Sequence, residues 1–123
     1  MDKKTTMEDT TSIIGKRCAE FDEIKARAQI IAQKYNPEKI ILFGSYANGR
    51  ASTDSDVDLL IIMNTKQSSY ELSSEIALTL DHSFPLDIII KTPEQISERL
   101  KMNDFFIQDI FNHGKVIYER TRK

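Results

Sequence analysis

Hydrophobic positions in the first third of the chain recur at steps of three and four. The positions that share this spacing are Ile14, Cys18, Phe21, Ile24, Ala28, Ile31 and Tyr35. Such spacing places side chains on one face of an amphipathic helix. Asn36-Pro37 ends the pattern, because the residue before a proline disfavours the helical region. We therefore predict a helix from about Ser12 to Tyr35, with Cys18 in the core.

Three short apolar runs follow this helix and predict buried strands. They are Lys39–Phe43, Val57–Met63 and Leu86–Lys91, each bounded by turn-forming residues. A short helix near Tyr46–Asn48 and a polar loop over Arg50–Ser55 connect the first two. The third run is nearly all apolar, as expected for a strand that is covered on both faces.

A helix is predicted between the second and third strands. Ser68 and Glu71 have the spacing of a capping box, and Leu72, Ile76 and Leu80 form an apolar stripe after them. A helix of this length between two strands is the usual crossover between strands that lie parallel. We therefore predict that the second and third strands are parallel.

The last third of the chain predicts two helices and a final strand. Thr92–Gln95 has a threonine cap and a proline in the first turn, and Ile96 and Leu100 are expected to face inward.

A second short helix is predicted over about Asp104–Phe111, and Gly114 ends it before a last strand over Lys115–Glu119. Its phenylalanines, Phe105, Phe106 and Phe111, are too many for one helical face. We expect most of them in the core and the remainder in an exposed patch for a protein partner.

Composition limits the class of protein. The chain has 123 residues, of which 40% are hydrophobic and 29% charged, as in an ordinary soluble domain. We predict a flexible tail over residues 1–11 and a single domain over residues 12–123. The net charge of −2 argues against general nucleic-acid binding. No apolar run approaches the roughly 20 residues of a membrane span, and the single cysteine favours a cytoplasmic protein.

Candidate chemistry begins with two acids at the start of the second strand. Asp56 and Asp58 are two residues apart, so their side chains point to the same face of a strand, roughly 6–7 Å apart. Carboxylates so placed can bind Mg²⁺. A third carboxylate from a neighbouring strand would complete a two-metal site, and Asp87, inside an apolar run, is the candidate. The alternatives are a solvated turn for the pair and a solvated strand end for Asp87.

A glycine and a serine follow the first strand. A strand that turns at Gly44 into a short helix would aim backbone N–H groups at an anion. Glycine permits close approach of the backbone to a phosphate, and Ser45 adds a hydroxyl donor. A Gly-Ser pair alone indicates only a turn. Its value lies in its spacing from the aspartates.

Gly44-Ser45, ten residues, and then Asp56-Val57-Asp58 resembles the Gly-Ser-x10-Asp-x-Asp signature of the polymerase-β-like nucleotidyltransferase superfamily. More narrowly, the chain resembles the minimal nucleotidyltransferases, many of which look like antitoxins encoded beside a HEPN-domain toxin. The resemblance covers most of residues 12–119. It implies an α+β fold, with helices packed against a small mixed sheet.

The resemblance also implies an activity and a set of site residues. Asp56, Asp58 and Asp87 would hold two Mg²⁺ ions and carry catalysis, while Gly44 and Ser45 would bind the nucleotide. ATP would be the substrate, and its AMP would be transferred to a hydroxyl, namely a tyrosine of a cognate HEPN toxin.

One position departs from the family pattern. Asn48 stands where the family usually has an arginine. Arginine near a triphosphate acts as a charge clamp, whereas asparagine offers only neutral donors. Arg50, two residues later, is a candidate substitute.

Two other functions are consistent with the sequence. One is a binding module that neutralises a toxin by contact alone, which Asn48 favours and the three intact aspartates disfavour. The other is a nucleotidyltransferase for a small molecule of the aminoglycoside type. Relatives of that kind usually carry an extra helical domain, which this sequence does not show and which a separate chain would have to supply.

Overall fold

The computed structural model describes residues 19–52, 55–80 and 84–121. The described elements are α2 (Phe21–Tyr35), β1 (Lys39–Phe43), the 3-10 helix η1 (Gly44–Tyr46), β2 (Val57–Ile62), α3 (Ser69–Thr79), β3 (Leu86–Lys91), α4 (Pro93–Lys101), α5 (Phe105–His113) and β4 (Lys115–Glu119). The α+β class is as predicted. The predicted tail over residues 1–11 and Cys18 lie outside the described residues. Within the described ranges, no helix is both long and apolar enough to cross a lipid bilayer.

The strands form one mixed sheet in the order β3-β2-β1-β4. Strand β1 is antiparallel to both β2 and β4, whereas β2 and β3 are parallel and joined by α3, as predicted. Strand β3 is an edge strand, and only Ile90 within it is fully buried. The prediction that both faces of this strand are covered therefore holds only in part: Ile88 packs against one core and Ile89 against the other, but both stay partly exposed.

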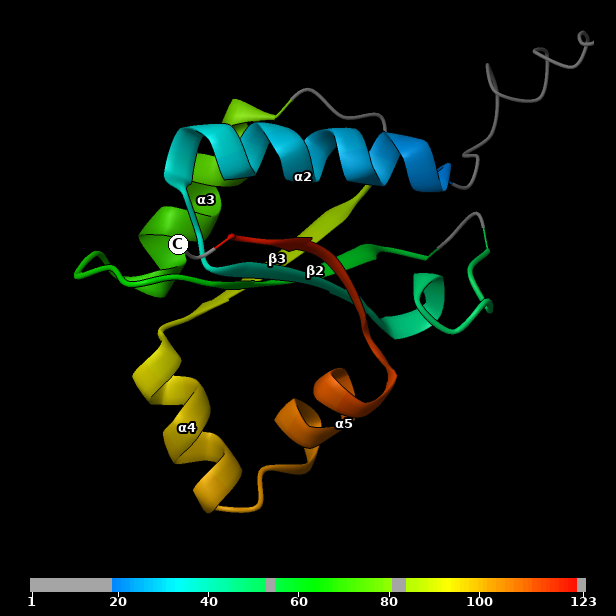
Figure 1. Ribbon diagram of the computed structural model, residues 1–123. Helices are drawn as coiled ribbons and strands as arrows, with labels where there is room; N and C mark the ends of the chain where they lie inside the picture. Colours follow the sequence, from blue (N-terminus) through cyan, green and yellow to red (C-terminus); the bar gives the residue numbers. More distant parts are fainter. Residues whose placement is uncertain (1–18, 53–54, 81–83, 122–123) are drawn as a thin grey trace, which may run out of the picture.

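Helices cover both faces of the sheet, with α2 and α3 on one side and α4 and α5 on the other (Figure 1). Successive side chains of a strand point to opposite faces, so each strand contributes to two cores. The core under α2 and α3 includes Ile24, Ile31, Ile40, Leu42, Leu59, Ile61 and Ile76, and the core under α4 and α5 is formed by Ile41, Leu60, Ile62, Ile96, Ile107 and Ile110.

Helix α2 begins later than the hydrophobic periodicity predicts. Glu20 is its N-cap and forms a capping box with Glu23, whose carboxylate accepts a hydrogen bond of 2.8 Å from the Glu20 N–H. Ala19 and Glu20 therefore lie outside the helix. The prediction of a continuous helix from about Ser12 is wrong at these two positions. Phe21, at the first helical position, is 47% exposed instead of being in the core.

The other predicted helix signals act locally. Asn36 adopts a left-handed conformation with φ 51° and ends α2. The Ser68 side chain accepts from the Glu71 N–H at 3.0 Å, which is one half of the predicted capping box. Thr92 and Gln95 form the complete capping box at the start of α4. These caps satisfy N–H groups that have no partner within the helix.

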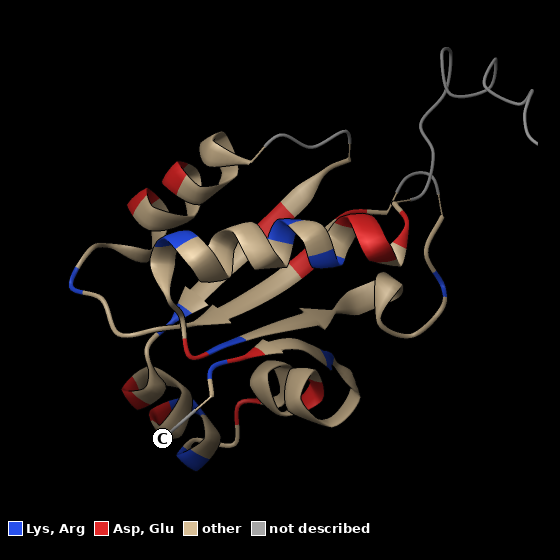
Figure 2. Cartoon of the chain, turned by 45° about the horizontal axis from the view of Figure 1, so that its top comes forward, with Lys and Arg blue, Asp and Glu red and all other residues tan. Residues whose placement is uncertain are grey.

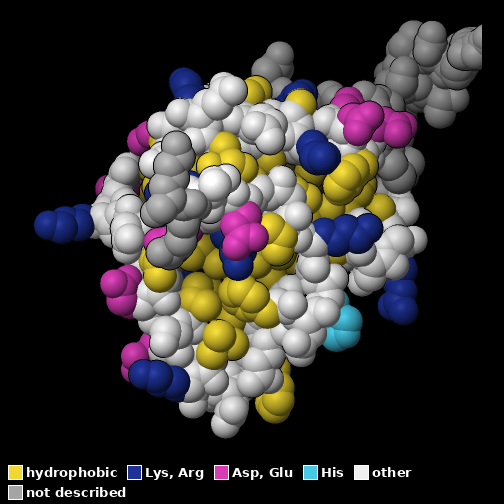
Figure 3. Space-filling view, in the orientation of Figure 1, with side chains coloured by type: hydrophobic (Ala, Val, Ile, Leu, Met, Phe, Trp, Pro, Cys, Tyr) yellow, Lys and Arg dark blue, Asp and Glu magenta, His cyan; other side chains and the backbone are white. Residues whose placement is uncertain are grey.

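The C-terminal helices leave more apolar surface exposed than predicted. The exposed fractions are 81% for Phe105, 51% for Phe106, 38% for Phe111 and 38% for Leu100. The prediction that most of the phenylalanines lie in the core, and that Leu100 faces inward, is wrong. Ile107 and Ile110 hold α5 against the sheet instead, because a short helix presents only one narrow face to it. Figure 3 shows hydrophobic side chains exposed beside α4 and α5.

Candidate active site

Of the three predicted acids, Asp58 and Asp87 lie at neighbouring positions of β2 and β3, and Asp56 lies just before β2. We call the three the acidic cluster. Asp58 is the second residue of β2 and pairs in parallel register with Asp87, the second residue of β3. Asp56 lies just before β2, and its negative charge contributes to the raised pKa of Asp58. The residues on either side of Asp58, Val57 and Leu59, pack under α2 and α3. The Asp58 and Asp87 side chains therefore lie on the α4–α5 face of the sheet. Figure 2 shows acidic positions along two adjacent strands of the sheet.

The pKa of Asp58 reflects this proximity. Burial raises the pKa of this carboxyl from 3.8 to about 6, with further contributions from the negative charges of Asp87 and Asp56. Asp56 and Asp87 are exposed, whereas Asp58 is partly buried. Within the described residues no basic side chain forms an ion pair with any of the three. The cluster thus carries an uncompensated negative charge that a bound cation would stabilise.

Gly44 packs directly against Asp58. Its φ of +78° is a backbone conformation that glycine adopts readily and other residues rarely. A β-carbon at Gly44 would collide with a carboxylate oxygen of Asp58. Phe43, just before it, pairs with Asp58 across the β1–β2 ladder. Both the backbone conformation and the close approach therefore require glycine at this position.

The turn after Gly44 is tighter than predicted. The short helix spans Gly44–Tyr46 rather than Tyr46–Asn48, because the left-handed glycine redirects the chain at once. The N–H groups of Ala47 and Asn48 both donate to the Gly44 carbonyl, at 3.0 and 3.2 Å. The Ser45 hydroxyl forms no side-chain hydrogen bond with another described residue. The turn therefore presents a free hydroxyl close to the acidic cluster.

Asn48 and Arg50 are both exposed on the loop that follows. The Arg50 N–H donates to the Ser45 carbonyl at 2.9 Å, which ties this part of the loop back to the turn. Among the described residues, no acidic side chain forms an ion pair with Arg50. Its guanidinium is therefore available to a ligand. Arg50 would need this if it replaces the arginine that the family usually has at the position of Asn48.

The acidic cluster offers the ligands that Mg²⁺ prefers, although its side chains are not gathered around one point. In the part of the chain that the structure describes, no three His, Cys, Asp or Glu side chains stand close enough to hold an ion. Carboxylate oxygens nevertheless suit this hard cation. Asp56 and Asp87 are exposed and can change rotamer. A cation would relieve the repulsion that raises the pKa of Asp58, so the donor set fits Mg²⁺.

Two aromatic residues that the sequence analysis did not assign to the site border the cluster. Phe43 pairs with Asp58, and the Phe106 ring meets the Phe43 ring edge to face, with centroids 5.7 Å apart. The sequence marks Phe43 only as the end of a strand. Phe106 is distant in sequence, and only the packing of α5 brings it here.

Neutralising one acid of the cluster is expected to lower the pKa of Asp58. With metal removed by a chelator, Asp87→Asn should move this pKa from about 6 toward 3.8, and Asp56→Asn should move it less, because Asp87 exerts the larger repulsion. Carbon-13 NMR of the Asp58 carboxyl against pH measures both changes. Glu98→Gln, at an exposed position on α4, serves as the control. An unchanged midpoint in Asp87→Asn would show that the two carboxylates do not interact.

Comparison with known proteins identifies the family. A model of the family described as polymerase beta, nucleotidyltransferase matches residues 26–123. Two proteins of Methanocaldococcus jannaschii, each named "Putative protein adenylyltransferase", are similar to the chain. MJ0604 is 31% identical over 97 residues, covering 77% of this chain and 94% of that protein. MJ0141 is 34% identical over 77 residues, covering 63% and 75%. The chain belongs to the polymerase beta nucleotidyltransferase family and is a nucleotidyltransferase.

Two solved structures share the fold. One is described as "a putative nucleotidyltransferase from Sulfolobus solfataricus", with a TM-score of 0.56 and 17% identity, covering 80% of this chain and 79% of that chain. The other is described as a toxin-antitoxin with AMP-PNP, with a TM-score of 0.52 and 20% identity, covering 79% and 74%. At identities this low, the structural similarity establishes a common fold alone. This fold agrees with the predicted α+β class.

Proposed function

We propose that this nucleotidyltransferase transfers AMP from ATP to a hydroxyl group of another protein. The observation that carries the proposal is the acidic cluster beside the Gly44 turn, because it places carboxylate ligands for a metal directly against a glycine turn. The names of the two Methanocaldococcus jannaschii relatives support both AMP as the transferred group and a protein as the acceptor.

In the proposed reaction the acceptor oxygen attacks the α-phosphorus of ATP. A bond forms between them, the bond from the α-phosphorus to its bridging oxygen breaks, and pyrophosphate leaves. Asp87, exposed beside Asp58, takes the hydroxyl proton and passes it to water. Catalysis comes mainly from positioning and from neutralisation of charge.

Asp56, Asp58 and Asp87 would hold two Mg²⁺ ions. When bound, these ions supply positive charge that neutralises the triphosphate and makes the acceptor hydroxyl more acidic. The Ser45 hydroxyl and the backbone after Gly44 contact the terminal phosphates. Gly44, which has no side chain, lets the Asp58 carboxylate lie directly against the backbone of this turn.

We further propose that the acceptor is a tyrosine of a HEPN-domain toxin, which makes this protein the antitoxin. The common fold with a structure described as a toxin-antitoxin with AMP-PNP supports a toxin as partner. The resemblance of the Gly44–Asp58 motif to the minimal nucleotidyltransferases supports a HEPN toxin in particular. A partner protein would bring its own surface to the exposed Asp87, so this small domain would not need an acceptor-binding domain.

The test is transfer of label from ATP in a lysate of the native host. The protein is incubated with Mg²⁺ and ATP labelled at the α-phosphate, and proteins are separated on a denaturing gel. We expect one labelled band that requires Mg²⁺, is lost with Asp58→Asn and is retained with Glu98→Gln. Mass spectrometry of the band identifies the modified residue, expected to be tyrosine.

The other outcomes of this experiment separate the competing functions. A labelled soluble product without a labelled protein would contradict the protein acceptor and indicate a small-molecule substrate. Absence of any label, with the partner shown to be present, would contradict catalysis and indicate an antitoxin that acts by contact alone.

A further inference from the structure

Strand β3 forms one edge of the sheet, so only one side of its backbone pairs with another described strand. The N–H of Val57 donates to the Pro85 carbonyl at 2.9 Å, so Pro85 directs its carbonyl toward β2. Adjacent residues of a strand direct their backbone groups to opposite sides. Asp87 therefore also pairs with β2, whereas Leu86 and Ile88 direct their N–H and C=O groups to the outer side. Among the described residues, neither of these two has a backbone partner on that side.

Only the first half of this edge is open. Ile90 is 1% exposed, whereas Leu86 and Ile88 are partly exposed. A groove of about 190 Å³ lies beside the open half, and it is lined by Ser73, Ser74, Ala77, Leu86, Asp87 and Ile88. The three residues that α3 contributes to this lining are small. The groove therefore has room for a side chain of an added segment.

The other edge strand, β4, is less suited to pairing with a further strand. Its register with β1 shifts between Ile40 and Ile41. Irregularities of this kind twist a sheet edge and protect it against added strands. Strand β3 instead keeps an unbroken register with β2 along its whole length. Its outer backbone groups are therefore evenly spaced, as an added strand requires.

The open half of the edge carries Asp87 of the acidic cluster. Asp87 is the register neighbour of Asp58, and both side chains lie on the α4–α5 face. A segment added to β3 would lie about 4.7–4.9 Å from it, and the residue opposite Asp87 would direct its side chain to the same face. A hydroxyl on that residue would therefore stand beside the carboxylate that is proposed to take its proton.

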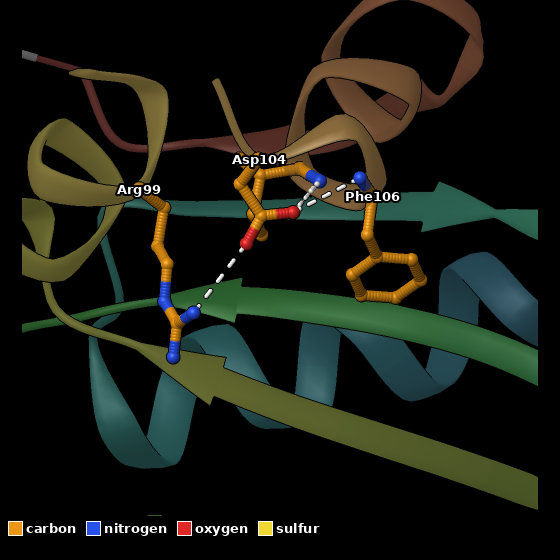
Figure 4. A network of polar contacts seen from close by, with 4 residues as sticks. Arg99, Asp104 and Phe106 are labelled. Atoms are coloured by element: carbon orange, nitrogen blue, oxygen red, sulfur yellow. Dashed lines mark hydrogen bonds and ion pairs between the residues drawn. The ribbon is translucent and has the colours of Figure 1, made fainter. Parts of the chain in front are cut away.

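Helices α4 and α5 are fixed to one another on this face of the sheet. The Asp104 carboxylate accepts hydrogen bonds from the N–H groups of Phe106, at 2.9 Å, and Ile107, at 3.2 Å. It also forms an ion pair of 3.5 Å with Arg99 of α4 (Figure 4). In the same view β3 is the outermost strand, at the foot of the picture. An added segment would therefore meet a face that is already ordered, which reduces the entropy lost on binding.

A second copy of this chain is a poorer occupant of the edge than another protein. The open half is short, so two copies that pair antiparallel through Leu86 and Ile88 would bring Asp87 of each directly opposite Asp87 of the other. Like charges directly opposite in neighbouring strands are destabilising. A segment with a neutral hydroxyl residue at this place avoids the repulsion.

We propose that the open half of the β3 edge binds an extended segment of the acceptor protein, which pairs with Leu86 and Ile88 as an additional strand. This inference rests on the proposed function, since it states how the acceptor reaches the same site. Backbone hydrogen bonds hold the segment, and the groove beside α3 accepts one of its side chains. The residue that receives AMP lies opposite Asp87.

Hydrogen exchange of the β3 amides tests this pairing. The host protein that takes the label from ATP is purified and added, with Mg²⁺ and a non-hydrolysable ATP analogue, to this protein labelled with nitrogen-15. The N–H groups of Leu86 and Ile88 should then exchange at least about ten-fold more slowly. Those of Asp87 and Ile89, which already face β2, should change less. This alternation distinguishes strand addition from contact through side chains alone.

A variant that fills the groove tests the same contact through activity. Ser74→Trp introduces a large side chain at an exposed position of the groove. Labelling of the host protein should fall by about ten-fold or more, while calorimetry should show unchanged affinity for the ATP analogue. Leu78→Trp is the matched control, because Leu78 lies on the same helix and is 87% exposed but does not line the groove.

The contrary outcomes separate this inference from the proposed function. Unchanged exchange at Leu86 and Ile88 in the presence of the labelled host protein would overturn strand addition, and so would normal labelling by Ser74→Trp. Slower exchange at these amides when the protein alone is concentrated, with a dimer in sedimentation, would assign the edge to a second copy instead. Nucleotidyl transfer would stand in each of these cases. If no host protein takes the label, the proposed function fails, and this inference fails with it.

Discussion

Replacement of Asp58 by asparagine is expected to abolish nucleotidyl transfer while making the fold more stable. Transfer should fall by more than about a hundred-fold, because even residues that only support a metal ligand cost up to that much when removed. The fold should gain because the folded-state pKa of about 6, against 3.8, means that ionised Asp58 opposes folding at neutral pH. Since the side chain is partly exposed and screened by solvent, we expect a gain of about 1–2 kcal/mol.

The stability gain depends on pH in a defined direction. Below pH 3.8 the Asp58 carboxyl is mostly protonated in both the folded and the unfolded chain, so it does not lower the stability of the fold. Between 3.8 and about 6 the folded protein binds more protons than the unfolded chain, and its stability falls as pH rises; above about 6 the cost is complete. Urea denaturation in chelator, for the unmodified protein and Asp58→Asn across this window, measures the difference.

Glu98→Gln removes an exposed charge on α4 and should change neither transfer nor the pH dependence of stability, which makes it the control. Two results would contradict the expectation for Asp58→Asn. An Asp58→Asn variant that is less stable than the unmodified protein above pH 6 would show that the carboxylate is compensated in the folded state. A variant that transfers AMP normally would remove Asp58 from the active site.

Replacement of Gly44 by alanine is expected to destabilise the fold by about 2–4 kcal/mol and to impair transfer. The left-handed conformation, φ +78°, costs a residue with a β-carbon about 1–2 kcal/mol. The β-carbon must also displace the Asp58 carboxylate, and overpacking of this kind costs about 1–3 kcal/mol. Transfer should fall because the displaced carboxylate leaves the acidic cluster. Urea denaturation and the labelling assay measure the two losses.

Gly49 provides a matched control for this substitution. Its φ is +77°, but a β-carbon there would meet nothing within 4 Å. Gly49→Ala should therefore show only the conformational cost of about 1–2 kcal/mol, and its difference from Gly44→Ala isolates the collision. In an Asp58→Ala background the cost of Gly44→Ala should approach that of Gly49→Ala. Equal losses of folding stability in Gly44→Ala and Gly49→Ala would contradict the contact between Gly44 and Asp58.

Much of the candidate site could be predicted because its signals are local. Asp56 and Asp58 are two residues apart, so they could be placed near one another before the structure was known, although β2 begins only at Val57. Asp87 was predicted from a charge in an otherwise apolar strand, and the parallel register now places it beside Asp58. The turn at Gly44 followed from its residue type, although the short helix begins two residues earlier than predicted.

The errors occur where burial depends on what an element packs against. Phe105 satisfies the same hydrophobic pattern as Ile107, yet the first is 81% exposed and the second 1%. Periodicity indicates that α5 has an apolar face but not how much of that face the sheet can cover. The sequence of β3 predicts a strand covered on both faces, but only Ile90 within it is fully buried. In both cases the hydrophobic content was read as burial, which only the neighbouring elements determine.

The sequence by itself determined where the strands and the longer helices lie after residue 36, and that Asp56 and Asp58 stand close together where β2 begins. These properties depend on backbone geometry and on interactions between residues close in the chain. Only the tertiary structure decided that Asp87 stands beside Asp58, that Gly44 touches the Asp58 carboxylate, and that Phe106 meets Phe43 next to both. These contacts join residues far apart in sequence, and their geometry is set by strand register and helix packing, which no local pattern encodes.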